Sequence, residues 1–150
     1  MVKPQIKRSR LRSRAENTAV RNVISVAREY EAHLALPGVY SYREVAANFG
    51  VSKVMVSYYL TLLARLPADF LAWLEACTEK LPLTFFSLKR LRPVTLLDEA
   101  DRKAALLALI RTLIEEMEGQ PSEAVPKLLR IMDDELHQAP GRFFRAIQLD

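Results

Sequence analysis

The stretch SYREVAANFGVSKVMVSYYLTLL, residues 41–63, decides how the rest of the chain is organised. Ser41 is followed three residues later by Glu44, the spacing of a capping box, which predicts that a helix begins here. Gly50 predicts the end of that helix, because glycine tolerates the left-handed conformation that closes many helices. Ser52 favours the start of a second helix, since a serine oxygen can cap the free amide groups of a first turn. The stretch therefore predicts two short helices joined by a tight turn.

Apolar residues recur at helical spacing on both predicted helices. The first helix presents Val45, Ala46 and Phe49, the turn adds Val51, and the second helix presents Val56, Tyr59, Leu60 and Leu63. Ala46 is small and lies four residues before Gly50, where two helices that cross steeply leave little room. This combination is typical of a DNA-binding helix-turn-helix. The alternative is a helical hairpin that serves packing alone.

In a helix-turn-helix the second helix enters the major groove of DNA by its N-terminal end. Side chains near that end and off the apolar face are candidates for DNA contact. They are Ser52, Lys53, Val54, Ser57 and Tyr58, and the start of the first helix adds Ser41, Tyr42 and Arg43. Lys53 can meet a phosphate or a guanine edge, Ser57 can donate or accept, and Val54 can touch a thymine methyl. Tyr58 is equally compatible with a place in the core.

The first fourteen residues, MVKPQIKRSRLRSR, are basic and contain no acid. Their cations are Lys3, Lys7, Arg8, Arg10, Arg12 and Arg14. Such a block repels itself, so we expect a flexible arm over residues 1–15. On DNA the arm can lie along phosphates or enter the minor groove. The alternatives are a solvated tail and a charged start of the first helix.

Composition predicts an all-α fold. The 150 residues are half apolar, contain four glycines and are rich in Ala, Leu, Glu and Arg, which suits one domain, with or without a small helical appendage. We expect a helix-turn-helix followed by a helical bundle, about six to eight helices in all. Residues 16–93 would form the DNA-binding domain, and residues 94–150 a C-terminal helical region suited to dimerisation.

Periodicity and proline positions place the other helices. One is expected over residues 16–36, and the others over residues 68–79, 84–91, 96–118 and 122–137. Pro93 is expected to end the third of these five, and the regular part of the last can begin at Pro126. Leu96, Leu97, Ala100 and Ala104 begin the predicted apolar stripe of the longest helix.

In the segment 84–91 and just beyond it, apolar and basic residues alternate at helical spacing. Phe85, Phe86, Leu88 and Leu91 are expected to face inward, and Lys89, Arg90 and Arg92 outward. The three cations form either a second phosphate-contacting patch or a solvated face.

Positive charge is concentrated at one end of the chain. The net charge is +4, but residues 1–65 hold 11 Lys and Arg against 4 Asp and Glu, while residues 66–150 hold 11 against 14. The basic half is also the half with the predicted helix-turn-helix. Such asymmetry is expected when one end of a protein faces a polyanion.

Several classes of protein are disfavoured. The single Cys77 cannot form an internal disulfide and is expected to be a small core residue in a reducing cytoplasm. No apolar run approaches the length of a membrane span, and the basic N-terminus is not followed by an apolar signal segment. We therefore expect a cytoplasmic, nucleoid-associated protein without a membrane partner.

The sequence offers little for catalysis. The histidines are His33 and His137, of which His33 is expected to be a surface or packing residue. No His, Cys, Asp and Glu cluster has metal-ligand spacing, and the acidic run 133–135 is expected to be a solvated face. We expect neither an enzyme nor a bound metal or cofactor.

The order of residues resembles a known family. YSYREVAANFGVSKVMVSYYLTLLARLPADFLAWL, residues 40–74, is similar to the central DNA-binding region of the ParB family, including its KorB and nucleoid-occlusion branches. The matching positions are Glu44, Val45, Ala46, Gly50, Ser52, Val56, Ser57, Leu62, Leu63, Leu66 and Pro67. The likeness extends less specifically over residues 16–115. It implies sequence-specific binding of double-stranded DNA, in plasmid or mobile-element partition or in transcriptional regulation.

The resemblance does not extend to nucleotide chemistry. ParB proteins carry a CTP-binding domain before the helix-turn-helix, and the fifteen residues before the first predicted helix do not accommodate one. We expect a homodimer, since two-fold DNA sites are the usual way for one helix-turn-helix to gain affinity. The C-terminal helices would form that interface or bind another protein. The alternative is a helical adaptor that binds proteins and contacts nucleic acid non-specifically.

Overall fold

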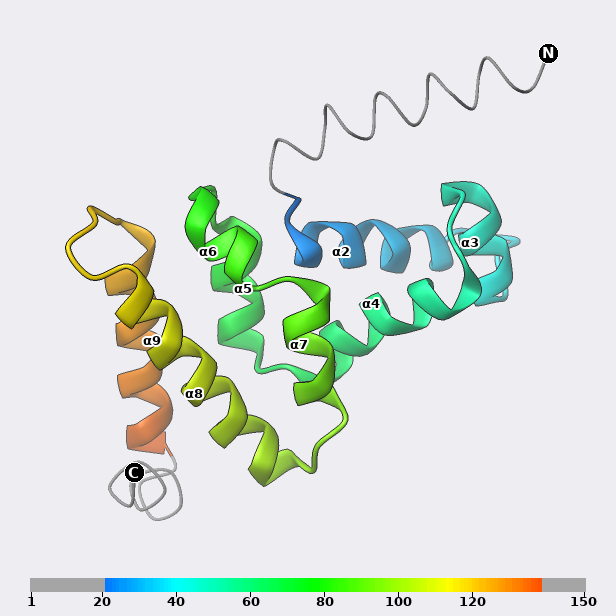
Figure 1. The fold of residues 1–150 in the computed structure, drawn as a ribbon. Helices are drawn as coiled ribbons and strands as arrows, with labels where there is room; N and C mark the ends of the chain where they lie inside the picture. The colour runs from blue at the N-terminus through cyan, green and yellow to red at the C-terminus, as the bar shows by residue number, and fades with distance from the viewer. Residues whose placement is uncertain (1–20, 139–150) are drawn as a thin grey trace.

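The computed structural model describes residues 21–138 of the chain, and within this range the secondary structure is entirely helical (Figure 1). The helices are α2 (Val23–Leu34), α3 (Tyr42–Phe49), α4 (Lys53–Arg65), α5 (Ala68–Ala76), α6 (Lys80–Phe85), α7 (Leu88–Thr95), α8 (Glu99–Glu116) and α9 (Ala124–Gln138). The prediction of an all-α fold with six to eight helices is confirmed. The basic arm and the tail from residue 139 lie outside the described residues, and so does the side chain of His137.

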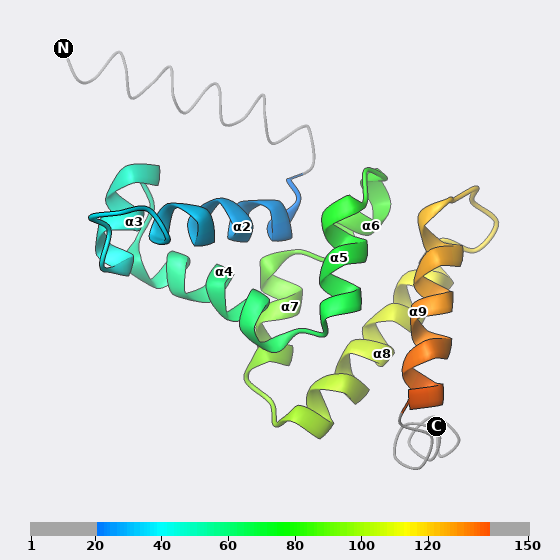
Figure 2. The same cartoon turned by 180° about the vertical axis from the view of Figure 1, so that it is seen from behind.

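The helices form two groups, α2–α4 and α5–α9. The groups meet where α7 packs on α4 and where α5 packs on α2. In Figures 1 and 2, α2 lies along α4, and α3 packs near the start of α4. From there α7 packs beside the later half of α4 and leads into α8, while α5 packs on both α2 and α9. Both views place α9 at the opposite end of the molecule from α3.

One apolar core runs through both groups. Its most buried large side chains include Ile24, Leu62, Phe70, Phe86 and Leu113. At its centre, Phe70, Trp73, Phe85 and Phe86 meet largely edge to face, with ring centroids 5.0–5.9 Å apart. Aromatic rings in this arrangement add to the stabilisation from apolar burial. The group α2–α4, which contains the predicted helix-turn-helix, therefore shares one apolar core with α5–α8.

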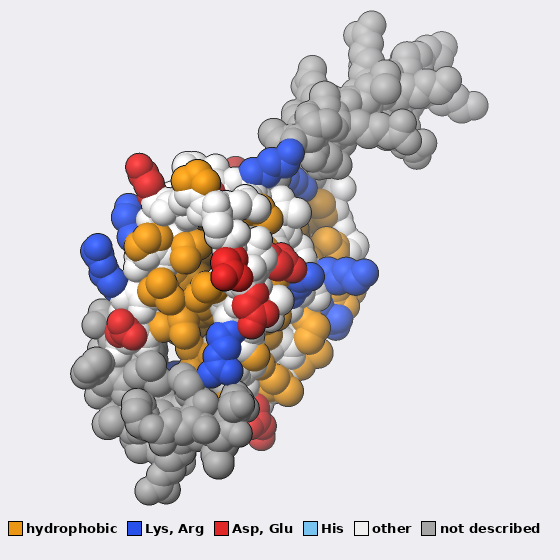
Figure 3. Space-filling view, turned by 60° about the vertical axis from the view of Figure 1, so that its left-hand side comes forward, with side chains coloured by type: hydrophobic (Ala, Val, Ile, Leu, Met, Phe, Trp, Pro, Cys, Tyr) orange, Lys and Arg blue, Asp and Glu red, His pale blue; other side chains and the backbone are white. Residues whose placement is uncertain are grey.

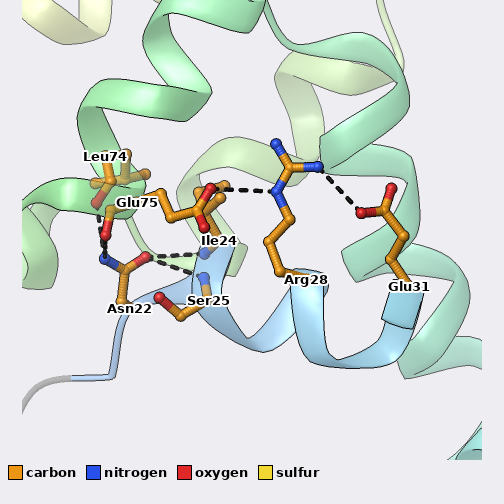
Figure 4. A network of polar contacts seen from close by, with 7 residues as sticks. All are labelled: Asn22, Ile24, Ser25, Arg28, Glu31, Leu74 and Glu75. Atoms are coloured by element: carbon orange, nitrogen blue, oxygen red, sulfur yellow. Dashed lines mark hydrogen bonds and ion pairs between the residues drawn. The ribbon is translucent and has the colours of Figure 1, made fainter. Parts of the chain in front are cut away.

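The first described helix begins later than expected, because Asn22 caps it. The Asn22 Oδ1 accepts hydrogen bonds from the amides of Ile24 (3.0 Å) and Ser25 (3.3 Å), and its Nδ2 donates to the Leu74 carbonyl at 2.7 Å (Figure 4). The backbone at Asn22 is extended. The prediction of one unbroken helix from residue 16 is therefore wrong at Asn22. The Asn22 side chain accepts the hydrogen bonds of the first amides of α2 and so acts as the N-terminal cap of this helix.

An ion-pair group extends the contact between α2 and α5. The Arg28 guanidinium donates to Glu75 at 3.2 Å and to Glu31 at 3.1 Å (Figure 4). The hydrogen bond with Glu75, followed by that with Glu31, raises the pKa of Arg28. The group is exposed, so it orients the two helices and contributes little stability.

The segment expected over residues 84–91 is in fact two helices. Pro82 lies in the first turn of α6, where its missing N–H is not needed. Ser87 begins α7 by accepting from the Arg90 amide at 3.3 Å. Pro93 does not end α7, which continues to Thr95. The helix tolerates Pro93 near its C-terminus, where the Thr95 hydroxyl donates to the Arg92 carbonyl at 2.6 Å.

The longest helix also begins later than expected. Leu96 and Leu97 form the connection after α7 and are exposed, Leu96 by 65%, and α8 starts at Glu99. Ala100 and Ala104 are exposed too. The apolar stripe predicted for this helix therefore began too early in the sequence. The Leu96 amide donates to the Pro93 carbonyl, so Leu96 belongs to the end of α7 and not to α8. The buried stripe of α8 and its end is Leu106, Leu107, Ile110, Leu113 and Met117.

A carboxylate fixes the start of α9 at Ala124, two residues before Pro126. Glu79 accepts from the Ser122 hydroxyl at 2.6 Å and from the amides of Glu123 and Ala124, each at 2.9 Å. Trp73 Nε1 donates to the Ala124 carbonyl at 2.8 Å. The hydrogen bond from Ser122, together with those from the two amides, lowers the pKa of Glu79. These contacts hold α9 against the α5–α6 connection.

We predict that Asn22→Ala destabilises the protein by about 1–3 kcal/mol, because two amides lose their acceptor and the Leu74 carbonyl loses its donor. Urea unfolding followed by circular dichroism measures this change. Ser25→Ala is the matched control, because this exposed serine neighbours Asn22 and only its backbone amide takes part in the cap. Equal stability of the two variants would contradict the role given to Asn22.

We predict that Glu79→Gln destabilises the protein by roughly 1 kcal/mol at pH 7 and much less at low pH. The pKa of Glu79 is lower in the folded state, so its charge adds stability above the ordinary value of about 4.3. That stability is lost as the pH falls through the folded-state pKa. Urea titrations at both pH values, followed by the fluorescence of Trp73, measure the difference. Exposed Glu118→Gln is the control, and a pH-independent difference for Glu79→Gln would refute the prediction.

Candidate nucleic-acid interface

The turn between α3 and α4 forms as the sequence predicts. Ser41 Oγ accepts from the Glu44 amide at 3.3 Å, and Glu44 in turn accepts from the Tyr40 amide at 3.1 Å. Gly50 has φ +68°, the left-handed conformation, and its amide bonds to the Ala46 carbonyl. Ser52 Oγ then accepts from the Met55 amide at 3.1 Å and so starts α4. The predicted caps and turn are therefore confirmed.

Packing behind the turn fixes the position of α4. Val45 and Ala46 of α3 are buried. Ala46 is the small residue that the sequence places before the turn. Tyr30 of α2 contacts Tyr59 edge to face, with centroids 5.4 Å apart, and its ring also lies 4.9 Å from that of Phe49. Phe49 lies at the edge of this cluster and stays partly exposed, and not inside as expected.

His33 has a packing role, as expected. Its ring lies edge-on to that of Phe49, with centroids 5.6 Å apart, and the residue is half-buried. The ring thus helps to cover the edge of the aromatic cluster that holds α2, α3 and α4 together.

The inward face of α4 differs slightly from the prediction. Val56, Tyr59 and Leu62 are buried, whereas Leu60 and Leu63 are only half-buried. At about 100° per residue, the opposite side of the helix carries Lys53, Val54 and Ser57. The inward face therefore turns these three residues away from α2 and α3.

The N-terminal end of α4 is open to solvent. Ser52, Lys53 and Val54 are exposed, Val54 by 53%, and Ser57 is half-buried. The structure thus brings Lys53, Val54 and Ser57 together on one side of α4, while Ser52 lies at its N-terminal end with its hydroxyl occupied as the cap. This side is free for a ligand without any rearrangement of the helices packed behind it.

The start of α3 contributes a second group. Tyr42 and Arg43 are exposed, whereas Ser41 is half-buried and occupied as the cap of α3. Tyr40, just before α3, is also exposed, by 85%. Its position just before a capping serine is the signal that places it outside the helix and off any apolar face.

Tyr58 lies on the flank of α4 that faces α7. The Arg92 guanidinium carbon is 3.9 Å from the centroid of the Tyr58 ring. Both residues are half-buried, so Arg92 packs against α4 and is only partly turned outward, which differs from the fully outward position expected. Its long side chain lies over α4 because a flat cation packs well on an aromatic face.

The other predicted cations of α7 belong to a separate group. Lys89 and Arg90 are exposed, and the Arg90 guanidinium carbon lies 4.0 Å from the centroid of the Phe85 ring. The contact between α7 and α4 extends to the end of α4, where Arg65 donates to the Thr95 carbonyl at 2.9 Å. In Figures 1 and 2, α7 lies beside the later half of α4. The structure therefore does not bring Lys89 and Arg90 together with Lys53.

Three helices near this surface carry no acidic residue, whereas α3 carries the exposed Glu44 in its first turn. Neither residues 45–68 nor residues 80–97 contain Asp or Glu, so α4, α6 and α7 are free of carboxylates. Within residues 21–138, the cations of α4 and α7 form no ion pair with a described carboxylate; they are Lys53, Arg65, Lys89, Arg90 and Arg92. No carboxylate of the described chain neutralises their charges, which can therefore attract an external anion.

The opposite end of the molecule has a different character. Figure 3 shows hydrophobic side chains gathered on that face, with acidic and basic side chains mixed around them. A narrow apolar groove between α5, α8 and α9 is lined mainly by Pro67, Phe70, Leu106, Leu107, Ile110, Ile131 and Met132. This end is suited to apolar packing more than to binding a polyanion.

No cluster of metal-binding side chains is present in the described range. Residues 21–138 hold no group of three or more His, Cys, Asp and Glu side chains placed to bind a metal. Cys77 is buried, which confirms its expected place in the core, and burial raises the pKa of its thiol. No single described helix is long and apolar enough to cross a membrane; by length and composition α4 and α5 pass only as a pair, bent by 118°.

Comparisons with known proteins identify no relative. The chain matches no protein-family model, no curated protein and no solved structure. The resemblance to the ParB family therefore remains a prediction from residues 40–74.

Proposed function

We propose that this chain binds double-stranded DNA in a sequence-specific manner, with the N-terminal end of α4 in the major groove. The observation that carries the proposal is the exposure of Ser52, Lys53 and Val54 at the start of a helix that α2 and α3 fix from behind. A helix has a diameter of about 10–12 Å, and the major groove a width of about 12 Å. The first turns of α4 therefore fit the groove without displacing a neighbouring helix.

Each exposed group has a suitable partner on DNA. Lys53 donates to a guanine edge or a phosphate, Ser57 donates or accepts at a base edge, and Val54 packs against a thymine methyl. Arg43, at the start of α3, lies where the first helix of such a motif crosses the phosphate backbone. Residues 45–68 carry no carboxylate, so within α3, the turn and α4 the repulsion of a polyanion is limited to Glu44, which accepts from the Tyr40 amide.

The role that suits these features is partition of a plasmid or mobile element, or transcriptional regulation, by a ParB-like protein. In this proposal the protein is a cytoplasmic homodimer and not an enzyme, and two copies of α4 read a two-fold site. The helices α8 and α9 supply the contact between copies, because they lie at the end of the molecule away from α3.

Selection of bound fragments from random duplex DNA tests the proposal. A consensus sequence, preferred over random duplex by about 10³-fold or more at physiological salt, is the expected result. Salt-sensitive binding without any preference would instead favour a helical adaptor that contacts nucleic acid non-specifically. A palindromic consensus would in addition establish the two-fold arrangement.

We predict that Lys53→Ala and Ser57→Ala each weaken binding to the selected duplex by about tenfold and leave thermal stability unchanged, because both side chains point away from the core. Fluorescence anisotropy with the selected duplex and with a scrambled duplex measures the loss. Exposed Lys80→Ala on α6, outside the proposed contact between copies, is the matched control for lost charge. Unchanged affinity in both α4 variants would show that α4 is not the reading helix.

We predict that deletion of residues 1–14 weakens binding to all duplexes and reduces the slope of log K against log salt. Each phosphate contact contributes about 0.9 to that slope, so removing six cations should lower it by several units at most. Titration of the full chain and the truncated chain on the same two duplexes measures both effects. The same slope for both chains would show that the basic arm does not touch phosphate.

A further inference from the structure

The arrangement of Arg92 on Tyr58 differs from that of the other cations of α7. Arg90 lies on a ring of its own segment, Phe85, and its Nη1 donates to the Phe85 carbonyl at 3.3 Å. Arg92 instead crosses to another helix and stacks on Tyr58 of α4, 34 residues away in the chain. The Arg92–Tyr58 pair therefore links α7 to the flank of the helix that we assign to the major groove.

The Arg92 guanidinium is held in place but incompletely bonded. Its Nε is the buried side-chain nitrogen without a hydrogen-bond partner among the described residues. A buried donor that lacks a partner costs about 1–3 kcal/mol, so the stacked position is maintained against a penalty. The two terminal nitrogens have no hydrogen bond to the described chain and are not among its buried unpartnered atoms. The inner edge of the guanidinium thus faces the protein, and its outer edge is left for an acceptor.

The place of the pair on α4 limits what that acceptor can be. Tyr58 is one residue beyond Ser57, about 100° around the helix, and lies about 7–8 Å along the axis from Lys53. It is therefore beside the outward face of α4 and not on it. When a helix fills the major groove, groups on its flank face the sugar-phosphate strand that borders the groove and not the base edges.

We propose that the Arg92–Tyr58 pair is a preformed phosphate site, in which the outer edge of the Arg92 guanidinium donates two hydrogen bonds to one phosphate of the bordering DNA strand. Stacking on Tyr58 fixes the plane of the guanidinium, and a fixed fork is what a two-point phosphate contact requires. Neither α4 nor α7 carries a carboxylate to compete for it. The site rests on the proposed function and adds to it a contact from outside the helix-turn-helix.

Two substitutions at one position separate a fixed fork from simple charge. Arg92→Met keeps the apolar stem and removes the charge, so affinity should fall about tenfold on selected and scrambled duplexes alike, and the salt slope by about 0.9. Arg92→Lys keeps the charge and should preserve the slope, but it lacks the planar fork and should still lose several-fold in affinity. Lys80→Met on α6, an exposed cation outside α4, α7 and the proposed contact between copies, is the control for lost charge and should leave both quantities unchanged. Thermal unfolding verifies that each variant is folded.

The outcomes distinguish this site from the proposed function. If the wild-type chain binds no duplex with measurable affinity, both the function and the site are wrong. If it binds and Lys53→Ala weakens binding, but Arg92→Met behaves like Lys80→Met, the function stands and the phosphate site is refuted. An Arg92→Lys variant with wild-type affinity and slope would overturn the fixed fork, because charge alone would then be sufficient.

Discussion

The tight turn between α3 and α4 is the constraint on which the structure depends. It requires a left-handed residue, supplied by Gly50, and it includes Ala46, whose side chain is small and buried and whose carbonyl accepts from the Gly50 and Val51 amides. An alanine at position 50 would meet no neighbouring atom within 4 Å, so the demand for glycine comes from the backbone conformation and not from lack of space. The direction of α4 follows from these two residues, and with it the exposure of Ser52, Lys53 and Val54.

The second constraint joins this motif to the remaining helices. Asn22 satisfies the first amides of α2 with one side-chain atom and the last carbonyls of α5 with another. Tyr30, two turns further along α2, packs on both Tyr59 and Phe49. A single short helix thus connects the aromatic cluster behind the turn to the central core around Phe70. This arrangement gives α4 a rigid support while leaving its first turns uncovered.

Features encoded by neighbouring residues could be predicted, and those that depend on distant partners could not. The caps at Ser41 and Ser52 and the turn at Gly50 are local, and all three were predicted. The start of α2 was missed because the partner of Asn22 is Leu74, 52 residues away. The packing of Arg92 against α4 was missed for the same reason, since its ring partner Tyr58 lies on another helix. Leu96 and Leu97 were misplaced because apolar periodicity continues across the break between α7 and α8, where only backbone hydrogen bonds mark the end.

The burial of Cys77 has a practical consequence for studying this protein. It is the sole cysteine of the chain, it lies within the core, and its thiol is less readily ionised than usual. A maleimide reacts with the exposed thiolate, so a cysteine introduced on the surface can be labelled while Cys77 remains unmodified. Spectroscopic or crosslinking probes can therefore be placed along α4 one position at a time, without first removing the native thiol.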